Sequence, residues 1–149
     1  MTTIITEAMR LQPGAPPQPQ GVAIVILLLN NATAAECRVY PQSLAQGVAL
    51  PAIRVYQTGG GPLYADDGEV GLTNPRVIVD VVAMDYGAAK DLARQCLGIL
   101  SAYSGDVNGV DVQAIYMDDE RDDREGGSNS AEYVYIVSQA YQLWHTTGN

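Results

Sequence analysis

The chain has 149 residues, of which 47% are hydrophobic, and it carries a formal net charge of −9 at pH 7. A chain of this length is most simply one domain, and it is long enough to bury a sizeable core. The excess of acidic residues argues against binding to a nucleic-acid backbone or to an anionic membrane surface, because both need clustered Lys and Arg.

The N-terminal residues 1–21 are predicted to form a flexible arm, because four prolines between positions 13 and 19 forbid a helix there. The apolar run Val22–Leu29 follows and is too short to span a bilayer. Its periodicity does not separate a buried strand from a helix, although its polar and Ala-rich flanks favour a helix. The Ala32-Thr33-Ala34 segment mimics a signal-peptide cleavage site, but the long, proline-rich stretch before it argues against secretion.

A short strand is predicted at Ala52–Gln57, which the chain enters through Pro51. The Gly-rich segment Thr58–Thr73 follows, and its triple glycine invites comparison with a phosphate-binding loop. It has no Lys-Ser/Thr pair, no GxGxxG motif and no helical pattern directly after it, so that comparison fails. We therefore expect a long, flexible hairpin loop.

The clearest strand and the clearest helix are neighbours in the sequence. Arg76–Met84 is rich in β-branched residues and alternates as a strand does. The period then changes to that of an amphipathic helix, with Asp85 as the expected N-cap and Gly105 just past the end. The apolar stripe of this helix is expected to pack on the strand face that carries Val77, Val79 and Val81; the stripe comprises Ala89, Leu92, Ala93, Cys96, Leu97, Leu100 and Tyr103.

The two cysteines, Cys37 and Cys96, match no metal-binding spacing. Because Cys96 lies on the apolar stripe of the helix, we expect it to be a buried free thiol. Nothing in the sequence supports a disulfide between the two.

Two further strands are predicted near the C-terminus, at Val110–Met117 and Glu132–His145. The acidic segment Asp118–Arg124 between them is predicted to form a turn at a hairpin tip. It does not match an EF-hand calcium loop, whose sixth and twelfth positions are Gly and Glu rather than Asp123 and Asn129. The last strand is apolar on both faces, so it is expected at the centre of a sheet or at a subunit boundary.

The order helix, strand, strand, helix, strand, strand predicts an α+β fold, in which helices pack on an antiparallel sheet of about four strands. We expect residues 22–149 to form one domain after the flexible arm 1–21. The sequence nominates no catalytic, cofactor-binding or metal-binding residues. His145 is expected on the surface, and Asp80, within a strand, is expected to meet a cross-strand partner or a neighbouring subunit.

A succession of short motifs resembles the tail terminator and tail completion proteins of long-tailed bacteriophages. Their order and spacing carry the resemblance, which extends roughly from Val22 to Thr146. The motifs are CRVYP at Cys37–Pro41, LPAIRV at Leu50–Val55, RVIVDVV at Arg76–Val82, AAKDLA at Ala88–Ala93, the acidic MDDERD at Met117–Asp122, and a last strand that carries Trp144.

The resemblance implies a structural role in the virion, without enzymatic activity or a cofactor. Several copies, commonly six, would form a ring that caps the finished tail tube and joins it to the head-neck connector. The implied location is the tail or neck of the virion, with assembly in the host cytoplasm. The implied fold, a sheet with helices packed on it, agrees with the order of elements predicted above.

Two other function classes stay open at this stage, an acidic protein-binding module and a small-ligand-binding domain or enzyme. The second needs a pocket with convergent polar groups, and the sequence nominates none. Clustered carboxylates are the best candidates for docking onto a protein partner. These candidate interaction residues are Asp66, Asp67, Asp118, Asp119, Glu120, Asp122 and Asp123.

Overall fold

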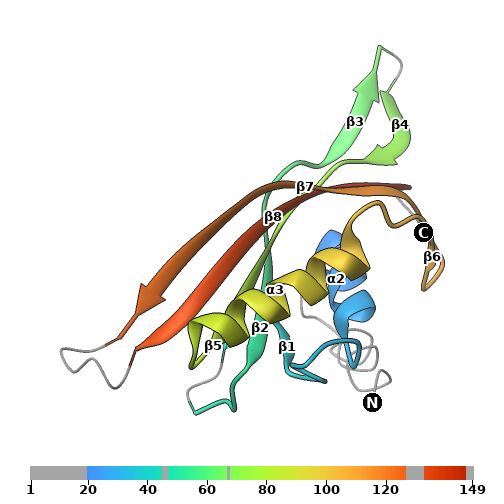
Figure 1. Cartoon of the computed structure of the whole chain (residues 1–149). Helices are drawn as coiled ribbons and strands as arrows, with labels where there is room; N and C mark the ends of the chain where they lie inside the picture. The colour runs from blue at the N-terminus through green and yellow to red at the C-terminus, as the bar shows by residue number, and fades with distance from the viewer. Residues whose placement is uncertain (1–19, 45–46, 67, 127–132, 147–149) are drawn as a thin grey trace.

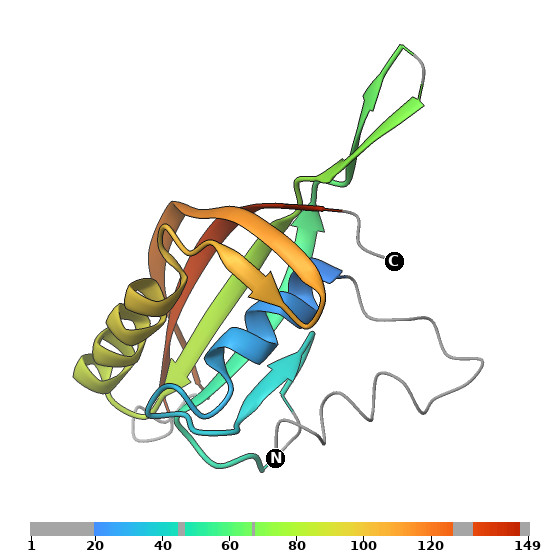
Figure 2. The ribbon, with the colours of Figure 1, turned by 90° about the vertical axis from the view of Figure 1, so that its right-hand side faces the viewer.

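The computed structural model describes residues 20–44, 47–66, 68–126 and 133–146. Within these residues, both helices lie on one face of a twisted, mostly antiparallel sheet (Figures 1 and 2). A hairpin of two strands rises clear of this body (Figure 2). The elements in chain order are α2 (Gln20–Leu29), β1 (Val39–Pro41), β2 (Ala52–Gly59), β3 (Pro62–Ala65), β4 (Gly68–Thr73), β5 (Arg76–Ala83), α3 (Tyr86–Leu100), β6 (Gly105–Val107), β7 (Val110–Glu125) and β8 (Val134–Thr146).

The sheet is built around β8, which confirms the expectation that the long C-terminal strand is central. The strand order is β1-β2-β5-β8-β4-β3, with β7 on the other side of β8 and β6 paired to β7. β1 runs parallel to β2, and the remaining pairs are antiparallel. β8 pairs with β5 and β7 along most of its length, so it lies inside the sheet rather than at an edge. A strand in this position can be buried on both faces, which accounts for its apolar residues on each.

The prediction of about four strands was too low, because the sheet of the described residues has eight. Two of the missed strands, β1 and β6, have only three residues, too few to show a period of two. The other two, β3 and β4, lie in the Gly-rich segment that was expected to be a loop. Glycine lowers strand propensity, so composition concealed this hairpin.

The acidic segment is also placed differently from the prediction. Asp118–Arg124 does not form a turn; it continues β7 in register with β8 as far as the pair Glu125 and Val134. Beyond Val112, β7 has β8 on one side and no described strand on the other. Charged side chains are tolerated on such an edge strand, because they reach solvent and discourage pairing with another chain.

The helix of the central segment agrees with the prediction at its start and differs at its end. Asp85 is the N-cap, and its carboxylate accepts a hydrogen bond from the backbone N–H of Ala88 at 3.1 Å. Ala102, rather than Gly105, takes the left-handed conformation after the helix, with φ of 62°. Its N–H donates to the carbonyl of Ile115 on β7, which fixes this otherwise costly geometry.

The first apolar run is a helix, as its flanks suggested. α2 begins at Gln20, and residues 1–19 of the predicted arm lie outside the described residues. Gly21 lets this helix approach the loop before β5, because a Cβ there would stand 2.8 Å from Cγ of Pro75. Five apolar residues of α2 are almost fully buried; they are Val22, Ile24, Val25, Ile26 and Leu29.

The core lies between the two helices and the sheet, as the apolar stripe predicted. Leu92, Cys96 and Leu100 of α3 are buried in one cluster with Val77, Val79 and Val81 of β5. Leu97 also packs against this cluster, as predicted, although it is only half-buried.

The cysteines behave as expected, with both thiols free, Cys37 exposed and Cys96 buried. Burial raises the pKa of the Cys96 thiol to about 12. The expectation for His145 was wrong, since its side chain is fully buried near the end of β8. Its Nδ1 lies 2.5 Å from the carbonyl oxygen of Thr146, and burial lowers its pKa.

Candidate interaction surfaces

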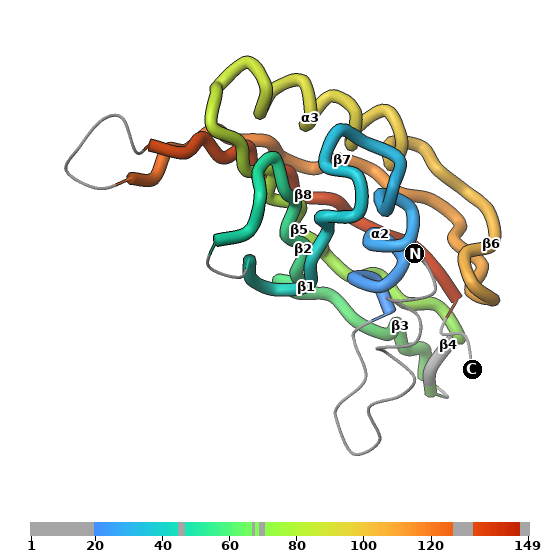
Figure 3. Tube along the Cα trace, turned by 90° about the horizontal axis from the view of Figure 1, so that it is seen from below, coloured from blue at the N-terminus to red at the C-terminus, as the bar shows by residue number. Residues whose placement is uncertain are grey.

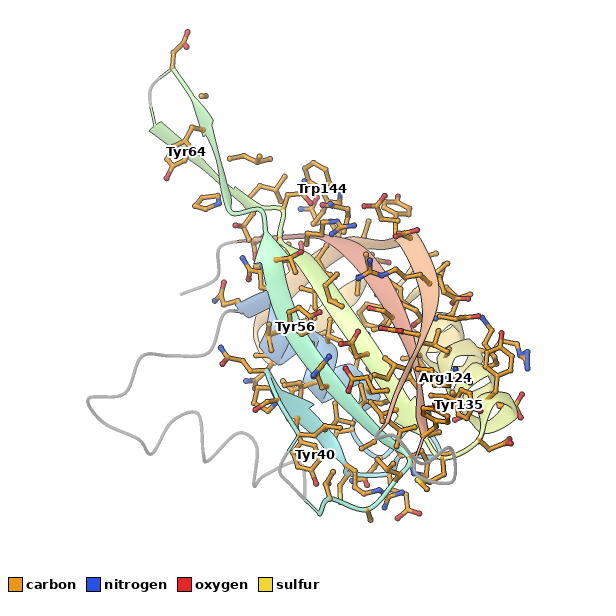
Figure 4. The ribbon with its side chains drawn as sticks, turned by 90° about the vertical axis from the view of Figure 1, so that its left-hand side faces the viewer. Tyr40, Tyr56, Tyr64, Arg124, Tyr135 and Trp144 are labelled. Atoms are coloured by element: carbon orange, nitrogen blue, oxygen red, sulfur yellow. The ribbon has the colours of Figure 1, made fainter. Side chains whose placement is uncertain are left out.

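One face of the sheet carries no described helix, and it forms the first candidate surface (Figure 4). Cross-strand partners share a face, so the register places one row of side chains across its middle. We call this the central row; it runs from β1 to β7 through Tyr40, Arg54, Asp80, Ser138 and Arg121.

Asp80 at the centre of the row is only 2% exposed, although no helix covers it. Nε and Nη2 of Arg54 donate to its Oδ2 at 2.8 and 2.6 Å. Oγ of Ser138 donates to Oδ1 at 2.5 Å. The carboxylate is therefore satisfied from both neighbouring strands, which confirms the expected cross-strand partner and explains how a charge is tolerated there.

Long polar side chains replace the missing helix on this face. The guanidinium of Arg54 lies 5.7 Å from the ring centroid of Tyr56. Burial and the charge of Asp80 raise the pKa of Tyr56, whereas the charges of Arg54 and Arg121 lower it. Beneath and around them lie apolar side chains that are at most 8% exposed; these are Ile78, Val82, Ile136 and Ala140.

The acidic residues of β7 lie on both faces of the sheet. Glu120 pairs in register with Gln139 and Asp122 with Val137, both on the helix-covered side. Nζ of Lys90 on α3, which runs alongside β7 (Figure 3), lies 3.0 Å from Oε2 of Glu120 and 3.1 Å from Oδ1 of Asp122. These two carboxylates are therefore already used to hold the helix against the strand.

The hydrogen bonds of this cluster lower the pKa of both carboxyl groups. Gln139 Nε2 donates to Glu120 at 2.9 Å and, with Lys90, lowers its pKa. The hydroxyl of Tyr86 donates to Asp122 at 2.7 Å and is the largest cause of its lowered pKa. The hydrogen bonds that Lys90 donates to Glu120 and Asp122 raise the pKa of Lys90.

The remaining predicted docking residues fall in three places. Asp118 pairs with Arg76 at 3.1 Å. Asp119 and Asp123 point to the uncovered side and are exposed, and neither forms a salt bridge within the described part of the chain. Asp66 is exposed at the turn of the β3–β4 hairpin, away from β7 (Figure 1), and Asp67 lies outside the described residues. The structure thus joins Asp118–Asp123 along one strand and separates them from Asp66.

The β3–β4 hairpin is the second candidate surface. It is joined to the sheet by two residue pairs, Leu72 with Thr146 and Thr73 with His145. Its base needs glycine, because Gly60 has φ of +85° and a Cβ there would stand 2.1 Å from the carbonyl oxygen of Asn74. Tyr64 projects from the hairpin with 69% of its surface exposed (Figure 4).

Sequence reasoning missed the arginines of the central row. Asp80 within a strand was noticed, and strand segments before and after it carry Arg54 and Arg121. That signal gives the residue types, but only the register shows that both arginines stand on the same row as Asp80.

In the ranges that the structure describes, no group of three or more His, Cys, Asp or Glu side chains is placed to hold a metal ion. No helix in those ranges is long and apolar enough to cross a bilayer.

Comparison with known proteins gives two findings. The family model described as tail completion protein gp17 matches residues 23–141, which is most of the chain. A solved chain from the "Virion of native gene transfer agent (GTA) particle" shares the fold, with a TM-score of 0.65, 12% sequence identity, and coverage of 83% of this chain and 92% of that chain. No curated protein matches. The resemblance inferred from the motifs is therefore confirmed, and the chain belongs to the tail completion protein gp17 family, whose members are structural proteins of phage virion tails.

Proposed function

We propose that this protein is a tail terminator, which forms a ring of about six copies on the end of the tail tube and joins the tail to the head-neck connector. Membership of the tail completion family over residues 23–141 is the observation that carries the proposal. Assembly would take place in the host cytoplasm before the tail meets the filled head.

A terminator acts by geometry. Tail-tube subunits stack head to tail, and such heterologous contacts extend without limit unless the growing end is capped. The ring would occupy the surface that the next tube subunit needs. Copies in a ring also meet head to tail, so each copy must offer two different surfaces. The uncovered sheet face and the projecting hairpin are two such surfaces, and they support this proposal.

Deleting the gene from the phage that encodes it tests the proposal directly. We expect tails that overgrow or fail to join heads, seen by negative-stain electron microscopy of lysates. A plasmid copy of the gene should restore normal particles, which controls for effects on neighbouring genes. Tails of normal length joined to filled heads in the deletion phage would overturn the proposal, and an acidic binding module would then become the leading alternative.

The acidic residues are proposed to steer this docking onto a basic surface of the tube or the connector. Within β7, Asp119 and Asp123 are the best placed, because Asp118, Glu120 and Asp122 already contact Arg76 or Lys90. Asp66 and Asp67 would steer the hairpin onto a basic protein surface by the same electrostatic attraction.

Docking of the purified protein onto tails from the deletion phage measures this steering. The double variant Asp119→Asn/Asp123→Asn should dock more slowly than the natural protein, and the difference should shrink as salt rises. Asp91→Asn on the exposed side of α3 is the matched control, expected to dock normally. Equal docking rates for all three proteins at low salt would show that Asp119 and Asp123 take no part in docking.

A further inference from the structure

The β3–β4 hairpin is incomplete as a folded unit. Apart from the two pairs at its base, β4 and β3 contact only each other as strands within the described residues. An isolated two-stranded hairpin is at best marginally stable in water. Tyr64 is exposed, and Leu63 and Leu72 are only half-buried, so the hairpin carries apolar surface that a partner could cover.

The hairpin also has a one-sided charge. Its segment from Gly59 to Thr73 contains Asp66, Asp67 and Glu69 and neither Lys nor Arg. A surface that takes it must therefore offer positive charge, together with aromatic or apolar side chains. Few parts of this chain can do so, because the whole sequence has 8 Lys and Arg against 17 Asp and Glu.

The uncovered sheet face has that combination. Arg54 and Arg121 stand on the central row, and the guanidinium of Arg54 lies 5.7 Å from the ring centroid of Tyr56. Asp80, the single carboxylate of the row, is paired with Arg54 and accepts a hydrogen bond from Ser138. With two guanidiniums and one carboxylate, the central row has a net charge of +1 in a strongly acidic protein, and Arg121 forms no salt bridge among the described residues. Aromatic residues surround it; they are Tyr40, Tyr56, Tyr116 and Trp144, and Figure 4 shows three of them. Arg and aromatic residues are the types enriched where protein interfaces bind most strongly.

We propose that, in the ring, the β3–β4 hairpin of one copy docks on the uncovered sheet face of the next copy, with its acidic turn toward Arg54 and Arg121 and Tyr64 among the aromatic side chains. This inference rests on the proposed ring and adds which two surfaces close it. The contact is heterologous, so it repeats around an axis, as a ring requires.

The flanking charges set the direction of approach. Asp119 and Asp123 stand two residues to either side of Arg121 on the same face and would repel an acidic turn. The Arg54 side of the row has no such neighbours on its own strand, since β2 contains no Asp or Glu. The hairpin therefore reaches the middle of the face from the β2 side.

Cross-linking in assembled particles tests the contact. The deletion phage is complemented with Tyr64→Cys/Gln142→Cys in a Cys37→Ser background, which removes the exposed natural thiol. Cys96 stays unreactive because it is buried. Gln142 lies on the uncovered face between Arg76 and Tyr116. With a short bis-maleimide reagent we expect covalent dimers and higher multiples up to the size of the ring.

The matched control pairs Tyr64→Cys with Arg94→Cys, on the exposed side of α3 and away from this face. It should stay monomeric on denaturing gels. Particles that assemble normally and cross-link in neither variant would overturn the hairpin contact and leave the terminator function intact. Loss of the ring itself, seen with the natural protein, would instead count against the proposed function.

Charge reversal gives a second, independent readout. Asp66→Lys alone and Arg121→Glu alone should each reduce the yield of joined particles at least tenfold, because each places like charges opposite one another. Their combination should recover most of the yield, since the charges then match again. Thermal unfolding of each purified variant shows whether its monomer is folded. Additive losses in the double variant would contradict the proposed pairing.

Discussion

The two faces of this sheet are both shielded from water, but by different means. On one face α2 and α3 cover apolar side chains such as Val79 and Tyr141, which are fully buried. On the other face no described helix covers Ile78, Val82, Ile136 and Ala140, which are nevertheless at most 8% exposed, and Arg54 and Tyr56 stand on the neighbouring strand β2. A packed helix is held by the whole core, whereas a long polar side chain lies along the sheet and keeps its charged head near solvent. The second kind of cover suits a surface that later receives a protein.

The two faces also contribute differently to the stability of the fold. Burial of apolar area stabilises by about 25 cal/mol per Å², and most of that area lies on the helix-covered face. The uncovered face holds a satisfied ion pair, which contributes less to net stability because both charges lose water. Variants of the two faces should therefore separate folding from assembly.

Leu92→Ala on the helix-covered face should have the largest effect on folding. Its side chain is 1% exposed, so truncation leaves a cavity and should cost about 2–5 kcal/mol in the free energy of unfolding. Leu97→Ala on the same helix is the control, and because Leu97 is only half-buried its cost should stay below about 2 kcal/mol. Chemical denaturation measures both, and equal costs would mean that α3 is rotated relative to the structure.

Arg54→Ala tests the uncovered face and should have the next largest effect. It leaves the buried carboxylate of Asp80 with Ser138 as its remaining donor, so we expect a loss of about 2–4 kcal/mol. Arg121→Ala removes an exposed guanidinium that forms no salt bridge among the described residues, and should cost less than about 0.5 kcal/mol. If the two variants were equally stable, the central ion pair would contribute nothing to the fold.

The same contrast explains how much of this structure could be predicted from sequence. The helix-covered face could be predicted, because the apolar stripe of α3 and the alternation of β5 are periodic over many residues. The family could also be predicted from the order of the short motifs, and the family model that matches residues 23–141 confirms it.

The uncovered face could not be predicted in the same way, because its residues share no period. Arg54, Asp80 and Arg121 come from three strands that are far apart in the chain, and only pairing brings them together. The acidic segment Asp118–Arg124 was wrongly predicted to form a turn for a related reason. Its composition is typical of a turn, yet Lys90 and Gln139 stabilise Glu120 and Asp122 within a strand.

The smallest effect concerns the charged edge where the helix-covered face meets solvent. The pKa values of Glu120 and Asp122 are lowered from 4.5 and 3.8 by their contacts, which include Lys90. A carboxyl group with a lowered pKa stabilises the fold fully above its unfolded pKa and loses that contribution as pH falls through the folded pKa. The contribution of Lys90, whose pKa is raised, is complete at every pH well below 10.5. The cluster should therefore be intact near pH 6 and lost as pH falls through the lowered pKa values of Glu120 and Asp122.

Lys90→Met isolates this cluster from the other carboxylates of the protein. Near pH 6 it should destabilise the fold by about 0.2–1 kcal/mol, since the ion pairs of Lys90 are partly exposed to solvent and screened by it. The difference from the natural protein should shrink as pH falls from 6 through the lowered pKa values of Glu120 and Asp122, because the protonated carboxyl groups no longer attract the ammonium group. Arg94→Met is the matched control, because its ion pair with Asp91 is about two-thirds exposed on both sides and lies within one helix. Thermal unfolding across this pH range measures both variants. A Lys90→Met difference that did not change with pH would show that the ammonium group acts on the ring of Tyr86, whose centroid lies 6.0 Å from Nζ, rather than on the two carboxylates.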